Sequence, residues 1–366
     1  MKLTPIAACA ALACAPAIAQ TSNVTLYGVL DVGITHASGS VSSVTAMNSN
    51  RNASSRLGVR GTEDLGNGLK ANFNLEGDVL VDAGTGVTNP LPGWSSSNNT
   101  TGAANGGFQF NRISTVGLSG GFGELTLGRY YTPTFLVDAQ YDPFTSNGVG
   151  FSLLSGTGVF YTAVGSVNHL RASNMINYVT PNYSGFTGTL SYAPSESQST
   201  APKDGQYTGA KLSYADAKLN ADFATGKTTL AAIGGLRTTS VGASYDFGAI
   251  KPMFEYSQDK QGAAGANGSK KGWVLGAWAP VGPGQVRFQY GHVTRTSDIT
   301  TEGKVTQVAL GYVYNLSKRT ALIGTVTTVK NTNYVNGPGA GYQVGGVVTS
   351  PNSTVNAYDV GIRHIF

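Results

Sequence analysis

The stretch "KANFNLEGDV", Lys70–Val79, alternates polar and apolar residues from end to end. Its polar set is Lys70, Asn72, Asn74, Glu76 and Asp78, and its other set is Ala71, Phe73, Leu75, Gly77 and Val79. Successive side chains of a β-strand point to opposite faces, so the stretch predicts a strand with one face toward water and one toward an apolar medium. A single strand of this kind fits a soluble sandwich and a membrane barrel equally well.

The number of such segments is more informative than any one of them. Fifteen others share the pattern, which makes sixteen: "VTLYGVLDVGI", "SRLGVRGT", "RISTVGLS", "ELTLGRY", "RASNMINYVT", "FTGTLSYA", "QYTGAKLSY", "AKLNADFA", "SVGASYDF", "IKPMFEYSQ", "KGWVLGAWA", "QVRFQYGH", "VTQVALGYVYN", "TALIGTVTT" and "NAYDVGIRHIF". An even number of antiparallel strands starts and ends on the same side of a sheet, as bacterial outer-membrane barrels do.

The connections between these segments alternate in length. Seven are short and turn-like, "EDLGNGL", "SGGFGE", "TPNYSGF", "YADA", "DFGA", "PVGPG" and "NLSKR", and eight are long. A soluble sandwich has no reason to place all its long loops at one end, whereas a transmembrane barrel has tight periplasmic turns and long outer loops. The sequence therefore predicts an all-β fold: a sixteen-stranded antiparallel transmembrane β-barrel with short periplasmic turns and long extracellular loops.

The N-terminus indicates export. "MKLTPIAACAALACAPAIAQ" has Lys2, an apolar stretch and small residues at Ala17 and Ala19, which is typical of a secretory signal cleaved before Gln20. We expect a signal peptide over residues 1–19 and a barrel domain over residues 20–366. Both cysteines, Cys9 and Cys14, lie in the signal, so the exported chain has no disulfide and no thiol chemistry.

Composition and motif search exclude several classes of protein. The chain has 50 glycines, 12% charged residues and a formal charge of +5, which does not suggest a nucleic-acid binder. No metal-ligand spacing is seen, and "SQDK" at Ser257–Lys260 opens a loop rather than a helix. We expect no enzyme activity, no catalytic residues, no cofactor and no metal site. The four histidines are dispersed and form no triad: His36, His169, His292 and His364.

The C-terminal stretch "NAYDVGIRHIF" remains in strand alternation up to its last residue. Tyr358, Val360, Ile362, His364 and Phe366 share the outward face. Because no strand edge can stay unpaired in lipid, this strand is expected to pair with the first one. Tyr358 and Phe366 are therefore assigned to barrel closure and assembly.

Several of these segments carry a family resemblance. "NVTLYGVLDVGI", "SRLGVRGTEDLGNGLKANFNLE", "RISTVGLSGGFGELTLGRYYTP" and the terminal Phe366 resemble the trimeric general-diffusion porins of Gram-negative outer membranes, in particular the betaproteobacterial branch. The resemblance implies a homotrimer in the outer membrane, with a third outer loop folded into the lumen to form a constriction between a basic wall and an acidic loop. It also implies contact with outer-membrane lipid and lipopolysaccharide, with periplasmic chaperones and with the barrel-assembly machinery.

The constriction can also be placed from the residues. Arg56 and Arg112 each lie seven residues before a turn, roughly 17 Å above it at ~3.3 Å per residue and ~40° tilt, and Arg171 lies somewhat higher. These three are expected to form an inward basic wall, with Arg60 and Lys70 also on it; each could instead be paired with an inward acid such as Glu76 or Asp78. The connector from Tyr131 to His169 is the longest, and its acidic residues are Asp138 and Asp142. It is expected to fold inward, the alternative being a mobile outer flap.

Arg129 differs from the other arginines because it shares parity with Leu125 and Leu127, which places it on the outward face. Lipid penalises a charge there, so we expect Arg129 to lie at a subunit interface and to meet a neighbour's second loop.

The predicted function is a water-filled channel for passive diffusion of small hydrophilic solutes and ions. Inward strand positions carry ten basic residues (Arg56, Arg60, Lys70, Arg112, Arg171, Lys211, Lys218, Lys251, Arg287, Arg363) and seven acidic ones (Asp31, Glu76, Asp78, Asp222, Asp246, Glu255, Asp359). The excess predicts a mild anion preference. The alternatives are a substrate-specific channel, which would need a track of lumen aromatics that inward Tyr27 alone does not supply, and a barrel enzyme.

Overall fold

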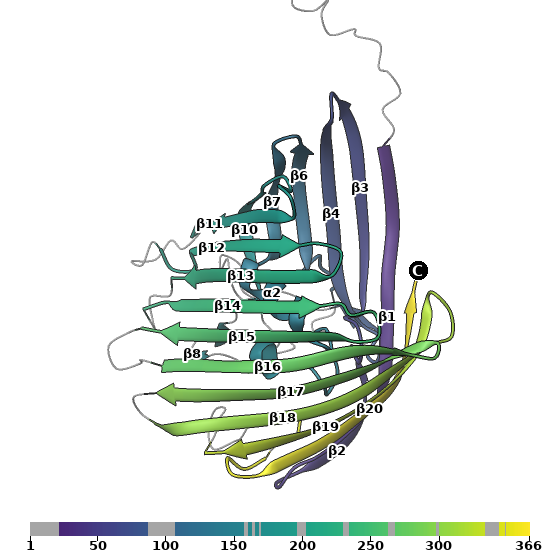
Figure 1. The fold of residues 1–366 in the computed structure, drawn as a ribbon, viewed down its shortest axis with the longest axis vertical. Helices are drawn as coiled ribbons and strands as arrows, with labels where there is room; N and C mark the ends of the chain where they lie inside the picture. The colour runs from purple at the N-terminus through teal and green to yellow at the C-terminus, as the bar shows by residue number, and fades with distance from the viewer. Residues whose placement is uncertain are drawn as a thin grey trace, which may run out of the picture.

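The computed structural model describes residues 22–86, 107–156, 160–162, 165–167, 170–195, 203–229, 234–262, 268–297, 300–333, 344–347 and 349–366. Within these ranges sixteen long antiparallel strands form a closed barrel, one for each segment that the sequence predicted. The signal expected over residues 1–19 lies outside the described residues. Figure 1 shows β13–β19 crossing the direction of β1, β3 and β4, as opposite walls of a barrel with tilted strands do.

The first eight wall strands are β1 (Ser22–Ser38), β3 (Arg56–Gly66), β4 (Leu69–Leu80), β6 (Ile113–Gly120), β7 (Gly123–Tyr131), β10 (Arg171–Val179), β11 (Phe186–Ala193) and β12 (Tyr207–Ala215). The other eight are β13 (Leu219–Thr228), β14 (Leu236–Tyr245), β15 (Lys251–Gln261), β16 (Gly268–Val281), β17 (Gly284–Ser297), β18 (Thr300–Asn315), β19 (Thr320–Thr332) and β20 (Thr354–Ile365). The connectors add β2 (Ser43–Ser49), β5 (Thr85–Gly86), β8 (Phe160–Thr162), β9 (Gly165–Val167), α2 (Pro133–Tyr141) and α3 (Leu153–Gly156).

The barrel closes between its first and last strands. Along one edge, β1 pairs with β3 through Ser22–Val29 and with β2 through Val32–Ser38. Along its other edge it pairs with β20, from Val29 opposite Ile365 to Ser38 opposite Asn356. This confirms the closure predicted from the C-terminal alternation, and it leaves the backbone polar groups of β20 with partners on both sides.

Side chains sort by face as the alternation predicts. The exposed apolar residues stand on the outer surface, where lipid covers them; they include Leu26, Val116, Leu127, Leu190, Phe223, Leu275, Leu310 and Val360. Polar residues at the intervening positions point inward. In β4, Asn74 and Glu76 both accept hydrogen bonds from the Tyr27 hydroxyl across the inner face. The polar face of Lys70–Val79 therefore lines the lumen.

The long connector after β7 folds into the barrel rather than over it. The helix α2 packs against the inner faces of β12–β15, and α3 packs against β16 and β17. Apolar side chains bury the contact in two groups, Val137 and Tyr141 with Ala224 and Met253, and Val149, Leu153 and Leu154 with Val274, Val293 and Val305. One side of the lumen is thus filled by the loop, which narrows the channel. Among the described helices none is long and apolar enough to cross a membrane.

Candidate pore constriction

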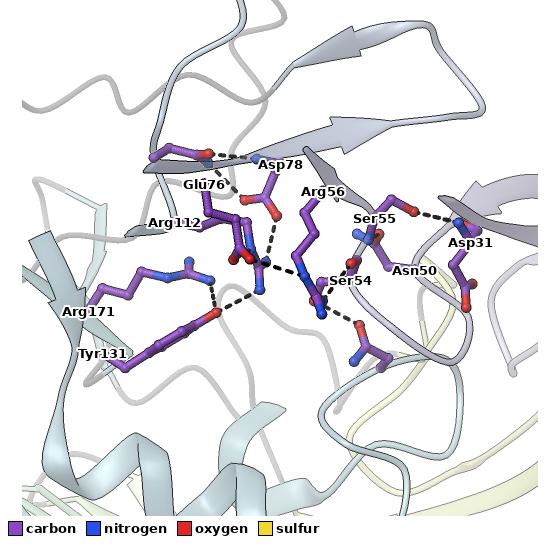
Figure 2. Close-up of polar contacts among 12 residues, drawn as sticks. Asp31, Asn50, Ser54, Ser55, Arg56, Glu76, Asp78, Arg112, Tyr131 and Arg171 are labelled. Atoms are coloured by element: carbon purple, nitrogen blue, oxygen red, sulfur yellow. Dashed lines mark hydrogen bonds and ion pairs between the residues drawn. The ribbon is translucent and has the colours of Figure 1, made fainter. Parts of the chain in front are cut away.

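Glu76 on β4 is the centre of a polar cluster on the inner wall (Figure 2). Its Oε1 accepts from Arg112 Nε at 2.7 Å, and its Oε2 lies 3.1 Å from both Arg56 Nε and the Tyr27 hydroxyl. The neighbouring inward acid, Asp78, accepts from Arg112 Nη1 at 2.7 Å. These charge-assisted bonds hold both carboxylates and the Arg112 guanidinium in a fixed arrangement, in which Glu76 and Arg112 are buried and Asp78 is partly exposed.

Arg112 points inward for a reason that alternation alone does not supply. It shares parity with Val116 and Leu118, which are 59% and 41% exposed on the lipid face. Arg112, however, lies on a bend immediately before β6, and the bend directs its side chain to the lumen. Its third partner is the Tyr131 hydroxyl, 2.6 Å from Nη2. The inward position that we predicted for Arg112 is therefore what the structure shows.

Arg171 completes the cluster from the other side of Tyr131. The two residues are register partners at the facing ends of β10 and β7. Arg171 Nη2 donates to the Tyr131 hydroxyl at 2.9 Å, and its guanidinium lies 4.5 Å from the centre of the Tyr131 ring. A bulge between Ala172 and Met175 resets the alternation of β10 at this point. Within the described parts of the chain, Arg171 has no carboxylate at ion-pair distance.

The three predicted arginines thus meet in one place, as Figure 2 shows. The alternative of pairing with Glu76 or Asp78 holds for Arg56 and Arg112 and does not hold for Arg171. Three guanidinium groups face two carboxylates, so the cluster retains positive charge. The Arg56 side chain is 30% exposed, which makes it the member most open to lumen water.

Arg60 and Lys70, the two other residues predicted for the basic wall, lie nearer the periplasmic side of the barrel. Arg60 is opposite Asn74, and its guanidinium lies 4.9 Å from the centre of the Tyr27 ring, exposed to water. Four residues of strand place it about 10 Å nearer the periplasmic turn than Arg56. Lys70 is opposite Asp64, beside the turn itself. The assignment of Lys70 to the constriction is therefore corrected: its position is the periplasmic mouth, because only one residue of β4 precedes it.

The loop that follows β7 begins with the helix α2. Thr132 caps α2 by accepting the Phe135 N–H at 3.3 Å, and Pro133 occupies the first turn, where its missing N–H costs nothing. The sequence analysis predicted only a long connector that folds inward here and missed the helix. The Thr-Pro pair after "RYY" was the available signal.

The two loop acids do not face the arginines, which corrects the expected basic-against-acidic constriction. Asp138 is fully buried and accepts from Ser240 Oγ of β14 at 2.9 Å. Asp142 is fully buried as well, and accepts the backbone N–H groups of Phe144, Ser146 and Ser152 at 2.7 to 2.9 Å. The first carboxylate fastens the loop to the wall and the second holds the loop's own turn.

Burial affects how these groups ionise. It raises the pKa of Asp142 to about 6, although the three N–H donors act in the opposite direction. Burial also raises the pKa of Tyr141, and the Asp222 carboxylate that accepts its hydroxyl at 2.6 Å raises it further. Tyr141 is therefore an uncharged donor at any physiological pH.

Glycines in the wall make room for the loop. A Cβ at Gly242 would lie 1.9 Å from the Tyr141 ring, and one at Gly276 would lie 2.2 Å from Pro143 Cγ. Trp278 Nε1 donates to the Pro143 carbonyl at 2.8 Å beside the second of these positions. Any larger residue at Gly242 or Gly276 would push the loop toward the pore axis.

The second half of the loop is fastened by charged groups of the wall: Asp359, which the sequence predicted on the inner face, and Lys270 and Asp259, which it did not. Asp359 of β20 accepts the Val149 N–H at 2.6 Å. Lys270 of β16 donates to the Leu154 carbonyl at 2.8 Å and pairs with Asp259 at 2.9 Å, with both ions buried. Lys270 and Asp259 lie just beyond the segments "KGWVLGAWA" and "IKPMFEYSQ", so extending each strand by one or two residues would have found them.

The face of α2 that turns away from the wall is neutral. Val137, Asp138 and Tyr141 are buried against β13–β15, while Phe135 and Leu136 are half-buried and Gln140 is exposed. Phe135 stacks on Tyr131 with ring centres 5.3 Å apart. The narrow part of the channel therefore has a basic cluster on one side and an uncharged loop face on the other.

Arg129 differs from expectation in its partners. It is 8% exposed, its Nε donates to the Asn111 carbonyl at 2.6 Å, and its Nη1 donates to Ser173 Oγ at 2.9 Å. Arg129 therefore has polar partners within its own chain, and its contact with a neighbouring subunit stays a prediction.

Barrel closure at the C-terminus has the expected geometry. Phe366 forms two backbone hydrogen bonds with Gly28, and its ring lies against the Gly28 Cα. The Tyr358 ring lies 5.3 Å from the His36 ring across the β1–β20 pair. Both residues that were assigned to closure therefore contact the first strand.

Comparison with known proteins agrees with this architecture. The family described as "Gram-negative porin" matches residues 6–334. Outer membrane porin protein 32 of Delftia acidovorans is 36% identical over 381 residues, covering 100% of both chains. A solved anion-selective porin from Comamonas acidovorans superposes with a TM-score of 0.79 at 35% identity, over 94% of this chain and 100% of that one. The trimer form of OmpT from Vibrio cholerae, 14% identical over 94% of this chain and 99% of that one, shares the fold with a TM-score of 0.65.

The matched range, the full-length relative and the sixteen-stranded barrel with its internal loop all lead to one conclusion. This chain belongs to the Gram-negative porin family, and it is an outer-membrane channel protein rather than an enzyme.

Proposed function

We propose that the channel admits small hydrophilic solutes and ions by passive diffusion and prefers anions mildly. One observation carries the preference: within the described residues, lumen arginines such as Arg60 and Arg171 have no carboxylate at ion-pair distance, while both loop acids are buried. On the inner wall this positive potential is opposed by Glu76 and Asp78, which are paired with Arg56 and Arg112. Fixed charges lining a narrow water column raise the local concentration of the opposite ion.

Aromatic side chains in the lumen favour diffusion over a specific sugar track. Three of the inward rings lie beneath arginines: Tyr27 beneath Arg60, Tyr131 beneath Arg171, and Trp278 beneath Arg287 at 5.5 Å. A ring whose face is covered by a guanidinium is not free to stack on a sugar. Liposome swelling with sugars of graded size separates the two functions, because diffusion gives uptake that stays linear with concentration and falls with solute size. Saturable uptake of one sugar would favour the substrate-specific channel.

The selectivity experiment is the reversal potential of single channels in a salt gradient. We expect the wild type to be anion-selective, and R60Q/R171Q to lose most of that selectivity because it removes two lumen charges that have no carboxylate partner among the described residues. The matched control is K227Q/R237Q, which removes the same charge from exposed positions on the lipid face of β13 and β14. A wild type that prefers cations, or equal shifts in both variants, would refute the assignment.

The expected assembly is a homotrimer exported with a cleaved signal over residues 1–19. Support comes from the family and from the trimeric form of one solved relative. Crosslinking of the purified porin tests the stoichiometry, and N-terminal sequencing tests cleavage before Gln20. In this proposal Arg129 contributes to a subunit contact only through guanidinium atoms that its bonds to Asn111 and Ser173 do not use. R129Q should therefore destabilise the β7–β10 part of the wall more than it destabilises the trimer. The roles of Tyr358 and Phe366 as assembly signals, read by periplasmic chaperones and the barrel-assembly machinery, belong to the same proposal.

A further inference from the structure

The chain between β2 and β3 leaves the barrel wall and enters the lumen. β2 pairs with Val32–Ser38 of β1 and β3 pairs with Ser22–Val29, so the two strands follow β1 with a gap between them, beside Asp31. Residues 50–55, which we call the inner strap, fill this gap on the lumen side. The strap directly precedes Arg56, so it lies at the height of the basic cluster (Figure 2).

The carboxylate of Asp31 holds the inner strap to the wall. It is fully buried and accepts the backbone N–H groups of Arg51, Asn52 and Ala53. Hydrogen bonds to an ionised acceptor are stronger than neutral ones. Ser55 adds two more bonds to β1, because its Oγ accepts the Asp31 N–H and donates to the Asp31 carbonyl, both at 2.9 Å. One inward side chain of β1 therefore fixes most of the strap.

The other side of the strap contacts the constriction loop, the connector between β7 and β10. Three hydrogen bonds of 3.0–3.1 Å join them: Gly148 N–H to the Asn50 carbonyl, Thr145 Oγ1 to the Asn52 carbonyl, and Ser54 Oγ to Asn147 Oδ1. Gly148 has a φ of 68°, and a Cβ there would lie 2.2 Å from the Arg51 carbonyl oxygen. The close approach of loop and strap therefore requires glycine at this position.

Asp359 of β20 binds both the strap and the constriction loop. Its Oδ1 lies 3.4 Å from Arg51 Nη1, and its Oδ2 accepts the Val149 N–H at 2.6 Å. Asp359 is the register partner of Thr35, on the same strand as Asp31. The pairing of β1 with β20 thus brings together two buried carboxylates, of which one holds the strap and the other holds the strap and the loop.

We propose that the inner strap is a wall of the constriction, and that Asp31 and Asp359 are positioning residues that set the size of the pore by holding the strap against the loop. The strap also orients one basic residue, because the Ser54 carbonyl accepts from Arg56 Nη1 at 3.0 Å. A released strap would no longer close the space between the basic cluster and the loop, so larger solutes would pass. The inference rests on the channel function and is independent of the ion preference.

The test is the size of the polyethylene glycols that single channels exclude. Each hydrogen bond to a charged acceptor shifts the equilibrium between bound and released strap by about tenfold. Asp31→Asn should therefore populate the released strap, raise the conductance and admit larger polymers. The matched control is Asp246→Asn, which removes the same charge from an exposed side chain in a periplasmic turn, where it accepts the Gly248 N–H. Wild-type exclusion in D31N would overturn the proposal.

A second variant separates position from charge. Gly148→Val moves the loop away from the Arg51 carbonyl without altering any charge, so it should admit larger polymers as D31N does. Its control is Gly248→Val, at a glycine that also has a positive φ but has nothing within 4 Å of its Cβ direction. A change in D31N alone would assign the effect to charge and overturn the positioning role, as would equal changes in G148V and G248V.

A disulfide between strap and loop provides a rescue. In D31N/S54C/N147C the two cysteines replace side chains that are in contact, so oxidation should join them and restore the wild-type exclusion size, and a reductant should reverse the effect. A role of Asp31 in barrel stability alone would lower the unfolding temperature and would not be reversed in this way. Cysteines that do not pair, or a disulfide that leaves the exclusion size large, would contradict the proposal. The shift between heated and unheated samples on a gel checks that each variant is folded.

Discussion

Gly28 and Phe366 exchange two backbone hydrogen bonds, Gly28 N–H to the Phe366 carbonyl at 3.0 Å and Phe366 N–H to the Gly28 carbonyl at 3.1 Å. The chain therefore ends on a residue that is paired with the first strand. The Phe366 ring lies where a Gly28 side chain would be, since a Cβ there would be 2.3 Å from ring atom Cζ. Barrel closure and the aromatic terminus thus depend on the same glycine.

Gly28→Val should destabilise the closed barrel. The added side chain must displace the Phe366 ring, and overpacking of this kind costs about 1–3 kcal/mol. We expect the temperature at which the barrel unfolds on a gel to fall, with a larger fall on deletion of Phe366. Gly324→Val is the matched control, because Gly324 is a strand glycine with nothing within 4 Å of its Cβ direction. Equal effects at Gly28 and Gly324 would show that the ring contact is unimportant.

Gly242→Val should move the constriction loop. The new side chain would occupy the place of the Tyr141 ring, which now lies against Gly242 and donates to Asp222. Loss of that contact frees the end of α2, so single-channel conductance should change by a clearly measurable fraction and become noisier. The double variant Tyr141→Ala/Gly242→Val removes the clash, so its single-channel current should be less noisy than that of G242V alone. If G242V conducts as the wild type does, the loop does not depend on this glycine.

Arg112→Gln should mainly reduce the stability of the barrel, whereas Arg171→Gln should mainly reduce its anion selectivity. Removing Arg112 leaves the buried Glu76 carboxylate and the partly exposed Asp78 carboxylate with fewer partners, and breaking a buried pair costs about 3–5 kcal/mol. Arg171 has no carboxylate partner among the described residues, so R171Q should reduce anion selectivity with little loss of stability. Unfolding temperature and reversal potential, measured on both variants, check the contrast. A large stability loss in R171Q with none in R112Q would contradict the arrangement of the cluster.

Asp142 should make selectivity depend on pH near its pKa of about 6. The carboxylate is charged at pH 7.5 and neutral at pH 5, so the reversal potential should become more anion-selective as the pH falls. The pKa in the folded protein is raised, so the stability that this group contributes is complete below the usual aspartate pKa of ~3.9 and is lost as the pH rises through 6. In Asp142→Asn the step near pH 6 should disappear. Its persistence in that variant would assign the step to another group.

Alternation along the chain was enough to predict the wall of the barrel. A β-strand has a period of two whatever its surroundings, so each of the sixteen segments predicted which side chains meet lipid and which meet water. Arg56, Arg60 and Glu76 were placed inward on this basis alone, and Phe366 was placed at the closure. The long connector after Tyr131 was expected to fold inward because of its length and residue content.

Only the tertiary structure determined the direction and the partners of side chains at positions where the regular strand geometry ends. Arg112 reaches the lumen from a bend, Arg129 finds Ser173 and the Asn111 carbonyl across neighbouring strands, and Asp138 turns to Ser240 about a hundred residues away in the chain. Local sequence carries no record of these partners, because each contact joins segments that meet only when the barrel closes. The physical reason is how far apart along the chain the interacting residues lie. The alternation of a strand is set by residues within that strand, whereas the burial of a loop carboxylate is set by residues on the opposite wall of the barrel.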